Sequence, residues 1–410
     1  MRVCQINTVY GQGSTGKIVR DLHLALLKNG VDSTVICPEA NQLTGEKGVY
    51  TVSNRMLSYS SAAYRRLTGR QYDGARLQTR RILSILNEIQ PDIVHLHCIN
   101  GNNINVYVLL KYLATHKIKT VFTLHAEFPY TGGCGHAYDC EKWLTGCGHC
   151  PYLEQTQSYL HIDRTSRTWK KWKSCYDLFD RDQLVIIAVS PWLADRAKKS
   201  PMIGRFDIKT VLNCVDTDVF QYRRNIELRH KLGIADDEKM IFHATASFDP
   251  TTDNLKGGRY IVELAKYFVN QPVKIVVAAN YGHVSDLPEN LIYIGRTKDQ
   301  IELAELYSEA DLTVITSKRE TFSMITAESL CCGTPVVGFK AGGPESIALS
   351  EHSEFVEYGN KEALNMTCSK WLRRSSDPHE IGYEAEGLYA TGAVLNDYIS
   401  LYTLIKDRSH

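Results

Sequence analysis

The stretch DLTVITSKRETFSMITAESLCCGTPVVGF, residues 311–339, joins two short apolar runs through a polar turn and a segment with helical spacing. Short apolar runs that alternate with amphipathic segments are typical of parallel strands whose faces are covered by helices. The stretch therefore predicts a strand over 311–316, a helix that begins near Ser323, and a second strand over 334–339. Such a unit indicates an α/β fold.

The same alternation runs through the rest of the chain. Apolar, β-branched runs occur at residues 2–7, 32–37, 92–97, 119–124, 183–190, 239–245, 273–280 and 291–296, and amphipathic segments at 16–30, 257–268 and 298–310. A chain of 410 residues is too long for one ordinary core. One series of strands ends and another begins near residues 210–220, so we expect two Rossmann-like parallel-sheet domains.

The expected boundaries follow from that break. We predict a first domain over residues 1–213, with a cysteine-rich loop at 131–152, and a second domain over 214–385. We also expect a C-terminal helix over 386–410 that packs back toward the first domain. Two sheets of this kind usually bind their ligand between them, outside the carboxyl ends of the strands.

The overall composition excludes several classes of protein. Lys and Arg number 47 against 46 Asp and Glu, which leaves a net charge of +1 and no signature of a nucleic-acid-binding protein. No apolar run approaches the roughly 18 residues of a membrane span, and the N-terminus lacks the pattern of a signal peptide. The 12 cysteines are therefore expected to be reduced in a cytoplasmic protein, with Cys4, Cys37 and Cys98 acting as small core residues.

A glycine-rich turn, YGQGSTGKIV at residues 10–19, follows the first predicted strand. It matches the phosphate-binding loop of nucleotide hydrolases at Gly11, Gly16 and Lys17. Ile18, however, stands where that loop needs a hydroxyl to bind Mg²⁺, so the match fails at the residue that carries the chemistry. The turn needs another explanation, either close approach to a ligand or a tight strand–helix connection without one.

Two carboxylates flank the predicted start of the helix at Ser323. Glu320 lies in the preceding loop, and Glu328 lies about a turn and a half into the helix. The first backbone N–H groups of a helix form a binding site for phosphate. Two acids around an anion site suit a ligand with hydroxyl groups on both sides of a diphosphate, which is the shape of a nucleotide sugar. The alternative is that both glutamates are solvated surface charges.

These motifs resemble those of a known family. GSTGKIV, DIVHLH, TLHAEFPYTGG, VSPWLADR, VLNCVDTDVF, LKGG and GTPVVGFKAGGPESI stand in the order found in retaining GT-B glycosyltransferases of family four. The resemblance spans almost the whole chain, and its first half is most similar to bacterial enzymes that build capsule or exopolysaccharide. It implies the GT-B fold and transfer of a hexosyl group from a nucleotide-sugar, UDP first and GDP second, to a glycan or lipid-linked acceptor.

The resemblance also implies roles for residues of the second domain. Glu328 would accept hydrogen bonds from the ribose, Glu320 would contact the donor sugar, and Lys256 would neutralise the diphosphate. The donor phosphates would be bound by the segment Thr321, Phe322, Ser323 and Met324. The arginine that the family places before the lysine is missing here, and Arg319, Arg296 or Lys318 are the candidates to replace it.

In the first domain the resemblance points to two further features. The turn Gly13, Ser14, Thr15 and Gly16 would approach the donor diphosphate or the acceptor. His125 ends a strand where the family has a histidine that touches the sugar, although the Asp that usually follows is Ala126 here. The alternative for His125 is a structural role. His95 and His97 alternate with apolar residues and are interpreted as core histidines on one sheet face.

The resemblance implies a mechanism without a covalent enzyme intermediate. No motif supplies a carboxylate nucleophile of the retaining-glycosidase kind, and no D-x-D metal signature is present, so no catalytic metal is expected. The protein would act by positioning and by stabilising the departing diphosphate. Two alternatives are a nucleotide-sugar epimerase on the same fold and a non-catalytic binder of sugar nucleotides.

The segment CGHAYDCEKWLTGCGHC places four cysteines within seventeen residues, namely Cys134, Cys140, Cys147 and Cys150. Four thiolates this close are a candidate structural zinc site. Paired disulfides and free thiols are the alternatives.

Residues 58–71 and 164–179 mix aromatic side chains with basic ones. Such faces can contact an anionic membrane, so we expect weak peripheral association with the inner face of the membrane. A solvated helix face with buried tryptophans is the alternative. The sequence does not determine the oligomeric state.

Overall fold

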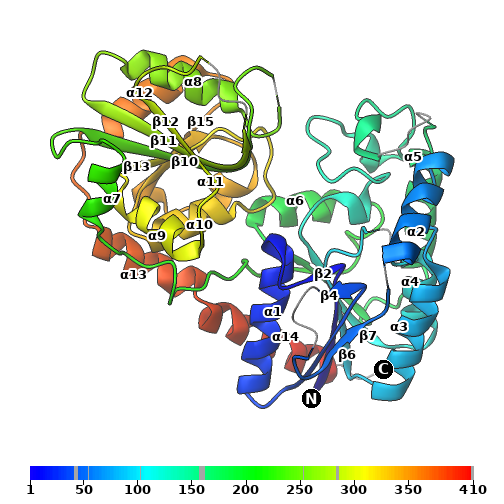
Figure 1. The fold of residues 1–410 in the computed structure, drawn as a ribbon. Coiled ribbons are helices and arrows are strands. Elements are labelled where there is room, and N and C mark those ends of the chain that lie inside the picture. The colour runs from blue at the N-terminus through cyan, green and yellow to red at the C-terminus, as the bar shows by residue number, and fades with distance from the viewer. Residues whose placement is uncertain are drawn as a thin grey trace. The chain divides into compact units, whose positions relative to one another are not determined.

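The computed structural model describes residues 1–40, 45–53, 55–101, 103–156, 162–252, 254–282 and 286–407. The chain divides into two compact units (Figure 1). Unit 1 comprises Met1–Leu212 together with the C-terminal stretch from Val394, and unit 2 comprises Asn213–Ala393. Among the described residues, no helix is both long and apolar enough to cross a membrane.

Unit 1 is built on a seven-stranded parallel sheet in the order β5-β3-β1-β6-β7-β8-β9. The strands are β1 (Arg2–Ile6), β3 (Asp32–Cys37), β5 (Val49–Thr51), β6 (Ile93–Leu96), β7 (Lys119–Leu124), β8 (Leu184–Ala188) and β9 (Asp207–Thr210), and β2 (Val9–Tyr10) pairs separately with β4 (Glu39–Ala40). The helices are α1 (Gly13–Lys28), α2 (Arg55–Thr68), α3 (Arg76–Ile89), α4 (Val106–Thr115), α5 (Thr165–Tyr176) and α6 (Pro191–Lys199). Central strands such as β7 are buried on both faces, which explains their continuous apolar runs.

Unit 2 repeats this plan with a six-stranded parallel sheet in the order β12-β11-β10-β13-β14-β15. The strands are β10 (Lys239–Phe248), β11 (Val273–Gly282), β12 (Leu291–Gly295), β13 (Leu312–Ile315), β14 (Val336–Phe339) and β15 (Ser353–Val356). The helices are α7 (Ile226–Lys231), α8 (Gly258–Phe268), α9 (Gln300–Glu309), α10 (Met324–Cys331), α11 (Gly343–Ile347), α12 (Lys361–Trp371) and α13 (Pro378–Tyr389). Helices α8 and α12 cover one face of the sheet, and α9 and α10 cover the other (Figure 1).

The predicted α/β class, with two Rossmann-like parallel sheets, is confirmed. Each apolar run that was interpreted as a strand forms one. Within the two large sheets, the strands β5, β9 and β15 were not predicted, and each lies at an edge of its sheet. An edge strand is covered less completely, and all three are partly exposed, so their sequences lack a continuous apolar run. The short separate pair of β2 and β4 was not predicted either.

The C-terminal segment differs from the expected single helix over 386–410. Helix α13 ends at Tyr389, Ala390 forms a β-bridge with Val215, and a new helix, α14 (Thr391–Asp407), begins directly after it. Ala390 has extended backbone angles, which interrupts the helical hydrogen bonds and separates the two helices. From Val394 onward α14 belongs to unit 1, where Tyr402 is fully buried.

Candidate functional site

The turn that carries Lys256 is fixed against the loop after β13. The Thr316 hydroxyl donates to the Lys256 carbonyl over 2.9 Å, and the Lys318 N–H donates to the Leu255 carbonyl over 2.8 Å. Gly257 has a φ of +67°, and a Cβ there would lie 2.2 Å from the Thr316 carbonyl oxygen. Only glycine fits this approach, so the L-K-G sequence places the Lys256 side chain at the carboxyl end of the sheet.

Lys256 and Glu320, which the sequence places 64 residues apart, form an ion pair with 2.6 Å between Nζ and Oε1. Their side chains are 26% and 20% exposed. The Glu320 backbone is fixed on both sides, because its N–H donates to the Ala341 carbonyl and its carbonyl accepts from the Gly343 N–H. The structure therefore brings two of the predicted site residues together, with a cation and a carboxylate side by side.

The start of α10 completes this site. Ser323 caps the helix, and its hydroxyl oxygen accepts from the Thr326 N–H over 3.3 Å. Its φ of +89° is unusual for a residue with a side chain. Strained backbone of this kind is often found where a loop must aim groups at a ligand. Thr321 and Phe322 are buried just before it, and the first helical residue is Met324, so the predicted phosphate-binding segment forms a helix N-terminus.

Glu328 lies in the second turn of α10, on the same helix as this N-terminus. Its carboxylate accepts a hydrogen bond from the Tyr307 hydroxyl over 3.3 Å. Tyr307 is fully buried in α9, and burial together with the charge of Glu328 raises the pKa of its hydroxyl well above the usual range. Tyr307 therefore stays a donor and orients Glu328. Sequence reasoning missed it, because one tyrosine in an amphipathic helix gives no signal of such a role.

Glu345 is a second residue that the sequence interpretation passed over. Its carboxylate accepts from the Ala341 and Gly342 N–H groups over 3.0 and 2.8 Å. These two residues precede Gly343, whose N–H binds the Glu320 carbonyl. The sequence GGPE does indicate this contact, because a glutamate three residues after the N-cap of a helix often accepts a hydrogen bond from the backbone N–H of the cap residue.

The other predicted site residues lie in unit 1. His125 follows β7, and its Nε2 lies 3.2 Å from Nδ1 of His97. Burial lowers the pKa of His125 to about 4, so the ring is neutral at pH 7. His95 and His97 are buried on the same sheet face, as their alternation predicted, and both of their rings make hydrogen bonds inside the unit.

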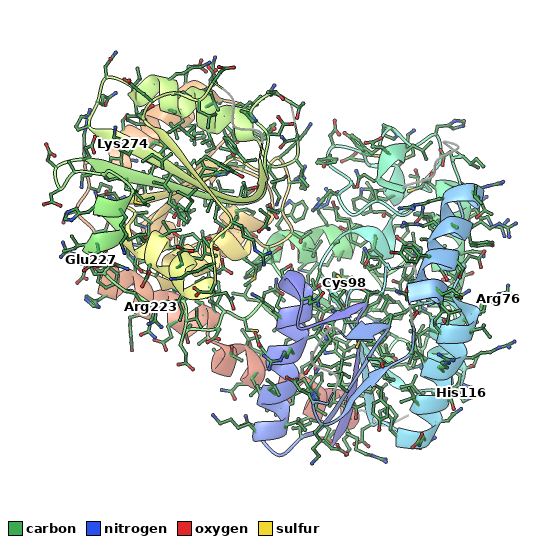
Figure 2. The ribbon with its side chains drawn as sticks, in the orientation of Figure 1. Arg76, Cys98, His116, Arg223, Glu227 and Lys274 are labelled. Atoms are coloured by element: carbon green, nitrogen blue, oxygen red, sulfur yellow. The ribbon has the colours of Figure 1, made fainter. Side chains whose placement is uncertain are left out.

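The glycine-rich turn forms the entry to α1. The helix begins at Gly13, which has a φ of +59°. A Cβ on Gly16 would lie 3.2 Å from the Val9 side chain and 3.3 Å from the Gly11 nitrogen, so this glycine permits close packing of the turn. Ser14 is exposed and Thr15 partly exposed. Figure 2 shows Cys98 at the carboxyl end of β6, and its thiol is hydrogen-bonded to Thr15.

Glu127, two residues after His125, is fully buried and anchors the segment that follows. Its carboxylate accepts from Arg196 Nε over 2.6 Å, from the Tyr130 hydroxyl over 2.8 Å and from the Ala137 N–H over 2.7 Å. The Arg196 guanidinium also lies over the Trp143 ring, 5.0 Å from its centroid. Glu127 is thus the centre of a buried polar network that connects α6 to the cysteine-rich loop.

The zinc prediction finds no support in the structure. Cys134, Cys140, Cys147 and Cys150 line one small pocket, and the 12 cysteines, all of which lie among the described residues, form no disulfide bond. Among the described residues, no three Cys, His, Asp or Glu side chains are arranged to hold a metal ion. Burial raises the pKa of the Cys134 and Cys147 thiols to about 12.

Comparison with known proteins identifies the family. The family model described as Glycosyltransferase Family 4 matches residues 15–219 of the 410. The chain belongs to glycosyltransferase family 4. A second model, described as Glycosyl transferases group 1, matches residues 283–387 of the enzyme. The predicted class of enzyme is therefore confirmed.

Individual relatives agree with this assignment. The glycosyltransferase is 22% identical to the putative colanic acid biosynthesis glycosyl transferase WcaC of Escherichia coli K12, over 98% of this chain and 99% of that relative. It is 27% identical to the N-acetyl-alpha-D-glucosaminyl L-malate synthase of Bacillus anthracis, but this match spans only 48% of this chain and 53% of that enzyme. The solved structure of Anabaena Alr3699/HepE in complex with UDP covers 98% of this chain and 100% of its own, with a TM-score of 0.63 at 14% identity. That likeness confirms the GT-B fold.

Proposed function

We propose that the enzyme transfers a hexosyl group from a nucleotide-diphosphate sugar to a glycan or lipid-linked acceptor, with a UDP-sugar as the first choice of donor and a GDP-sugar as the second. The observation that carries the proposal is the ion pair of Lys256 with Glu320 in the loop before α10. A cation suits a diphosphate, a carboxylate suits sugar hydroxyls, and a helix N-terminus suits phosphate oxygens.

Each end of the donor has a candidate partner. Glu328, oriented by Tyr307, accepts hydrogen bonds from the ribose hydroxyls. Glu320 accepts from hydroxyls of the transferred sugar, and Lys256 binds the diphosphate. In unit 1, His125 and the turn Gly13–Gly16 contact the sugar or the acceptor. The preference for uridine is supported by Alr3699/HepE, which was solved with UDP.

UDP is expected to raise the thermal stability of the enzyme more than GDP or ADP does. A ligand at about 100 times its dissociation constant adds about 2.7 kcal/mol, a shift that thermal denaturation detects readily. Glu328→Ala should weaken this shift, because the ribose loses its acceptor. Glu362→Ala, which removes an exposed carboxylate from α12, is the control and should keep the full shift. The donor site is misassigned if all three diphosphates leave the wild-type melting temperature unchanged.

We further propose that transfer retains the anomeric configuration. The departing phosphate, held by Lys256, helps to deprotonate the acceptor hydroxyl on the same face of the sugar, and the protein supplies position and charge stabilisation. The anomeric coupling constant of the product, measured by NMR, is expected to match that of the donor. A product of inverted configuration would contradict this mechanism.

The acceptor is proposed to be a growing bacterial capsule or exopolysaccharide chain. The support is the full-length similarity to a relative named for colanic acid biosynthesis. If this glycan is linked to lipid, the enzyme must work at the cytoplasmic face of the membrane, and unit 1 offers a face suited to that contact.

That face consists of α2 and the start of α5. Met56, Tyr59 and Leu67 are 81%, 71% and 61% exposed, and their spacing places them on one side of α2. A Cβ on Gly69 would lie 3.3 Å from Cγ of Arg164, so the basic start of α5 adjoins the end of α2. An apolar stripe beside basic residues is typical of a helix that lies on an anionic membrane.

Vesicles that contain anionic phosphatidylglycerol are expected to sediment the enzyme, whereas neutral phosphatidylcholine vesicles should bind it weakly. The triple variant Met56→Ser, Tyr59→Ser, Leu67→Ser should lose more than about tenfold in binding, since burial of one such side chain contributes about 1.5–3 kcal/mol. Met366→Ser with Tyr383→Ser, two exposed positions of unit 2, is the control. If the triple variant and the control bound anionic vesicles equally well, α2 would be ruled out as the membrane-contacting face.

A further inference from the structure

We propose that unit 1 contains a pocket that binds an anionic group of the acceptor, either a phosphate or a carboxylate. The lining of this pocket includes Ser61, Arg65, Arg70, Asn100 and Gly101. That its ligand is part of the acceptor rests on the proposed function. The preference for an anion follows from the residues of unit 1 alone.

The pocket lies where parallel α/β sheets usually bind their ligands. From the centre of the sheet, β3 and β5 follow on one side of β1, and β7, β8 and β9 follow on the other side of β6. Ligands of such sheets bind at this switch point, outside the carboxyl ends of the strands. Asn100 and Gly101 come shortly after β6, and a Cβ on Gly101 would lie 2.6 Å from the side chain of Thr8, which follows β1. The pocket is therefore beside the carboxyl ends of both central strands.

Helix α2 has an apolar side and a side that lines this pocket. Ser61 and Arg65 are four residues apart, so they lie on the same side of the helix. At about 100° per residue, this side is opposite to the exposed stripe of Met56, Tyr59 and Leu67. Ser61 is buried, as expected for a side that faces the body of unit 1. Arg65 thus brings its charge to the pocket from beneath α2.

The charge of Arg65 is partly desolvated. Burial lowers the pKa of its guanidinium, and the charges that act on it come from Tyr72 and Arg66, neither of which is a carboxylate. Arg196 shows the contrast within the same unit. Burial lowers its pKa as well, but the charge of Glu127 more than compensates, and the pKa is raised overall. An anion in the pocket would stabilise Arg65 as Glu127 stabilises Arg196.

Arg70 adds a second guanidinium group from the loop after α2. The hydrogen bond that it donates to the Tyr64 hydroxyl over 3.2 Å raises its pKa most, and Asp73 raises it further. Asp73 is itself paired with Lys171 over 2.7 Å, so its charge is already shared. Two guanidinium groups at one pocket repel each other, and an anion between them removes this repulsion and accepts their hydrogen bonds.

The size of the pocket defines how an anion enters it. It has room for a group about as large as one water molecule, which is the size of one phosphate or carboxylate oxygen. The Ser61 hydroxyl and the Asn100 amide add two uncharged donors. A phosphate would identify an acceptor linked to lipid through phosphate, and a carboxylate would identify an acidic sugar of a glycan acceptor.

Titration calorimetry with inorganic phosphate, glucuronate and neutral glucose, at constant ionic strength, tests the pocket. We expect an anion to bind the wild type and glucose not to bind. Arg65→Gln with Arg70→Gln should weaken anion binding by about tenfold or more, because charge-assisted hydrogen bonds are lost. Arg76→Gln with Arg80→Gln removes two exposed charges from α3 and is the matched control, with the affinity of the wild type expected (Figure 2 labels Arg76). If the double variant does not fold, Arg70→Gln alone must weaken the same binding.

Lys256→Ala separates this pocket from the proposed donor site. Anion binding that persists in Lys256→Ala and is weakened in the pocket variant supports the proposal, and the anion that binds more tightly identifies the acceptor group. The proposal is overturned if neither anion binds the wild type, if Lys256→Ala abolishes all binding, or if the α3 control loses as much affinity as the pocket variant. If UDP never stabilises the wild type, the proposed donor fails, whereas these titrations still decide whether the pocket binds an anion.

Discussion

Lys256→Ala is expected to lower kcat by about 10²–10³-fold, the range observed when one preorganised group that stabilises developing charge is removed. In the proposed reaction, negative charge builds on the diphosphate as the glycosidic bond breaks. Lys256 is fixed for this task, because Gly257 and Thr316 determine its backbone and Glu320 lies 2.6 Å from its ammonium group. Steady-state rates with a UDP-sugar, and the release of free UDP, measure the effect.

Lys274→Ala is the matched control. Lys274 forms an ion pair with Glu238 over 3.6 Å, and the two side chains are 27% and 20% exposed, almost the same as for Lys256 and Glu320. It lies at the amino end of β11, whereas Lys256 follows the carboxyl end of the neighbouring strand β10 (Figure 2 labels Lys274). We expect kcat within about twofold of wild type, because surface ion pairs contribute little. If Lys256→Ala and Lys274→Ala lowered kcat equally, reduced stability would explain the loss. That result would contradict a role of Lys256 in the chemistry.

The central strands and the start of α10 could be predicted from sequence for physical reasons. Parallel strands such as β13 and β14 are buried on both faces, so they appear as short apolar runs. Ser323 is a strong cap residue before a helical pattern, and α10 begins directly after it. Both signals lie within the residues of the element that they predict, so they can be recognised without knowledge of tertiary contacts.

The partners of the site residues could not be predicted, because tertiary packing chooses them. The Lys256–Glu320 pair spans 64 residues, and Tyr307 reaches Glu328 from a different helix. The four-cysteine spacing is local and suggested zinc, yet spacing does not fix where side chains point after the loop has packed. Glu127 follows Ala126, which occupies the position of the Asp usual in the family, so the motif itself gave Glu127 no role. Its partner Arg196 lies 69 residues further along the chain.

Glu127→Ala is expected to lower the free energy of unfolding by about 3–5 kcal/mol, the cost of leaving one charge of a buried pair without its partner. The carboxylate is completely buried and accepts three hydrogen bonds, from Arg196, Tyr130 and the Ala137 N–H. Denaturant unfolding measures the loss. Hydrogen exchange should show its largest increase in residues 131–152, because Ala137 is bound there.

Asp195→Ala provides the control from the same helix, α6. Asp195 pairs with Lys198 over 3.2 Å, but the two side chains are 71% and 57% exposed. Water already solvates both charges, so the change should stay within about 0.5 kcal/mol. If Glu127→Ala cost no more than Asp195→Ala, the buried network would contribute nothing to the stability of unit 1. Glu127 lies two residues after His125, just beyond the end of the same strand. A large loss of unfolding free energy, with increased hydrogen exchange confined to residues 131–152, would show that Glu127 determines the shape of the cysteine-rich loop.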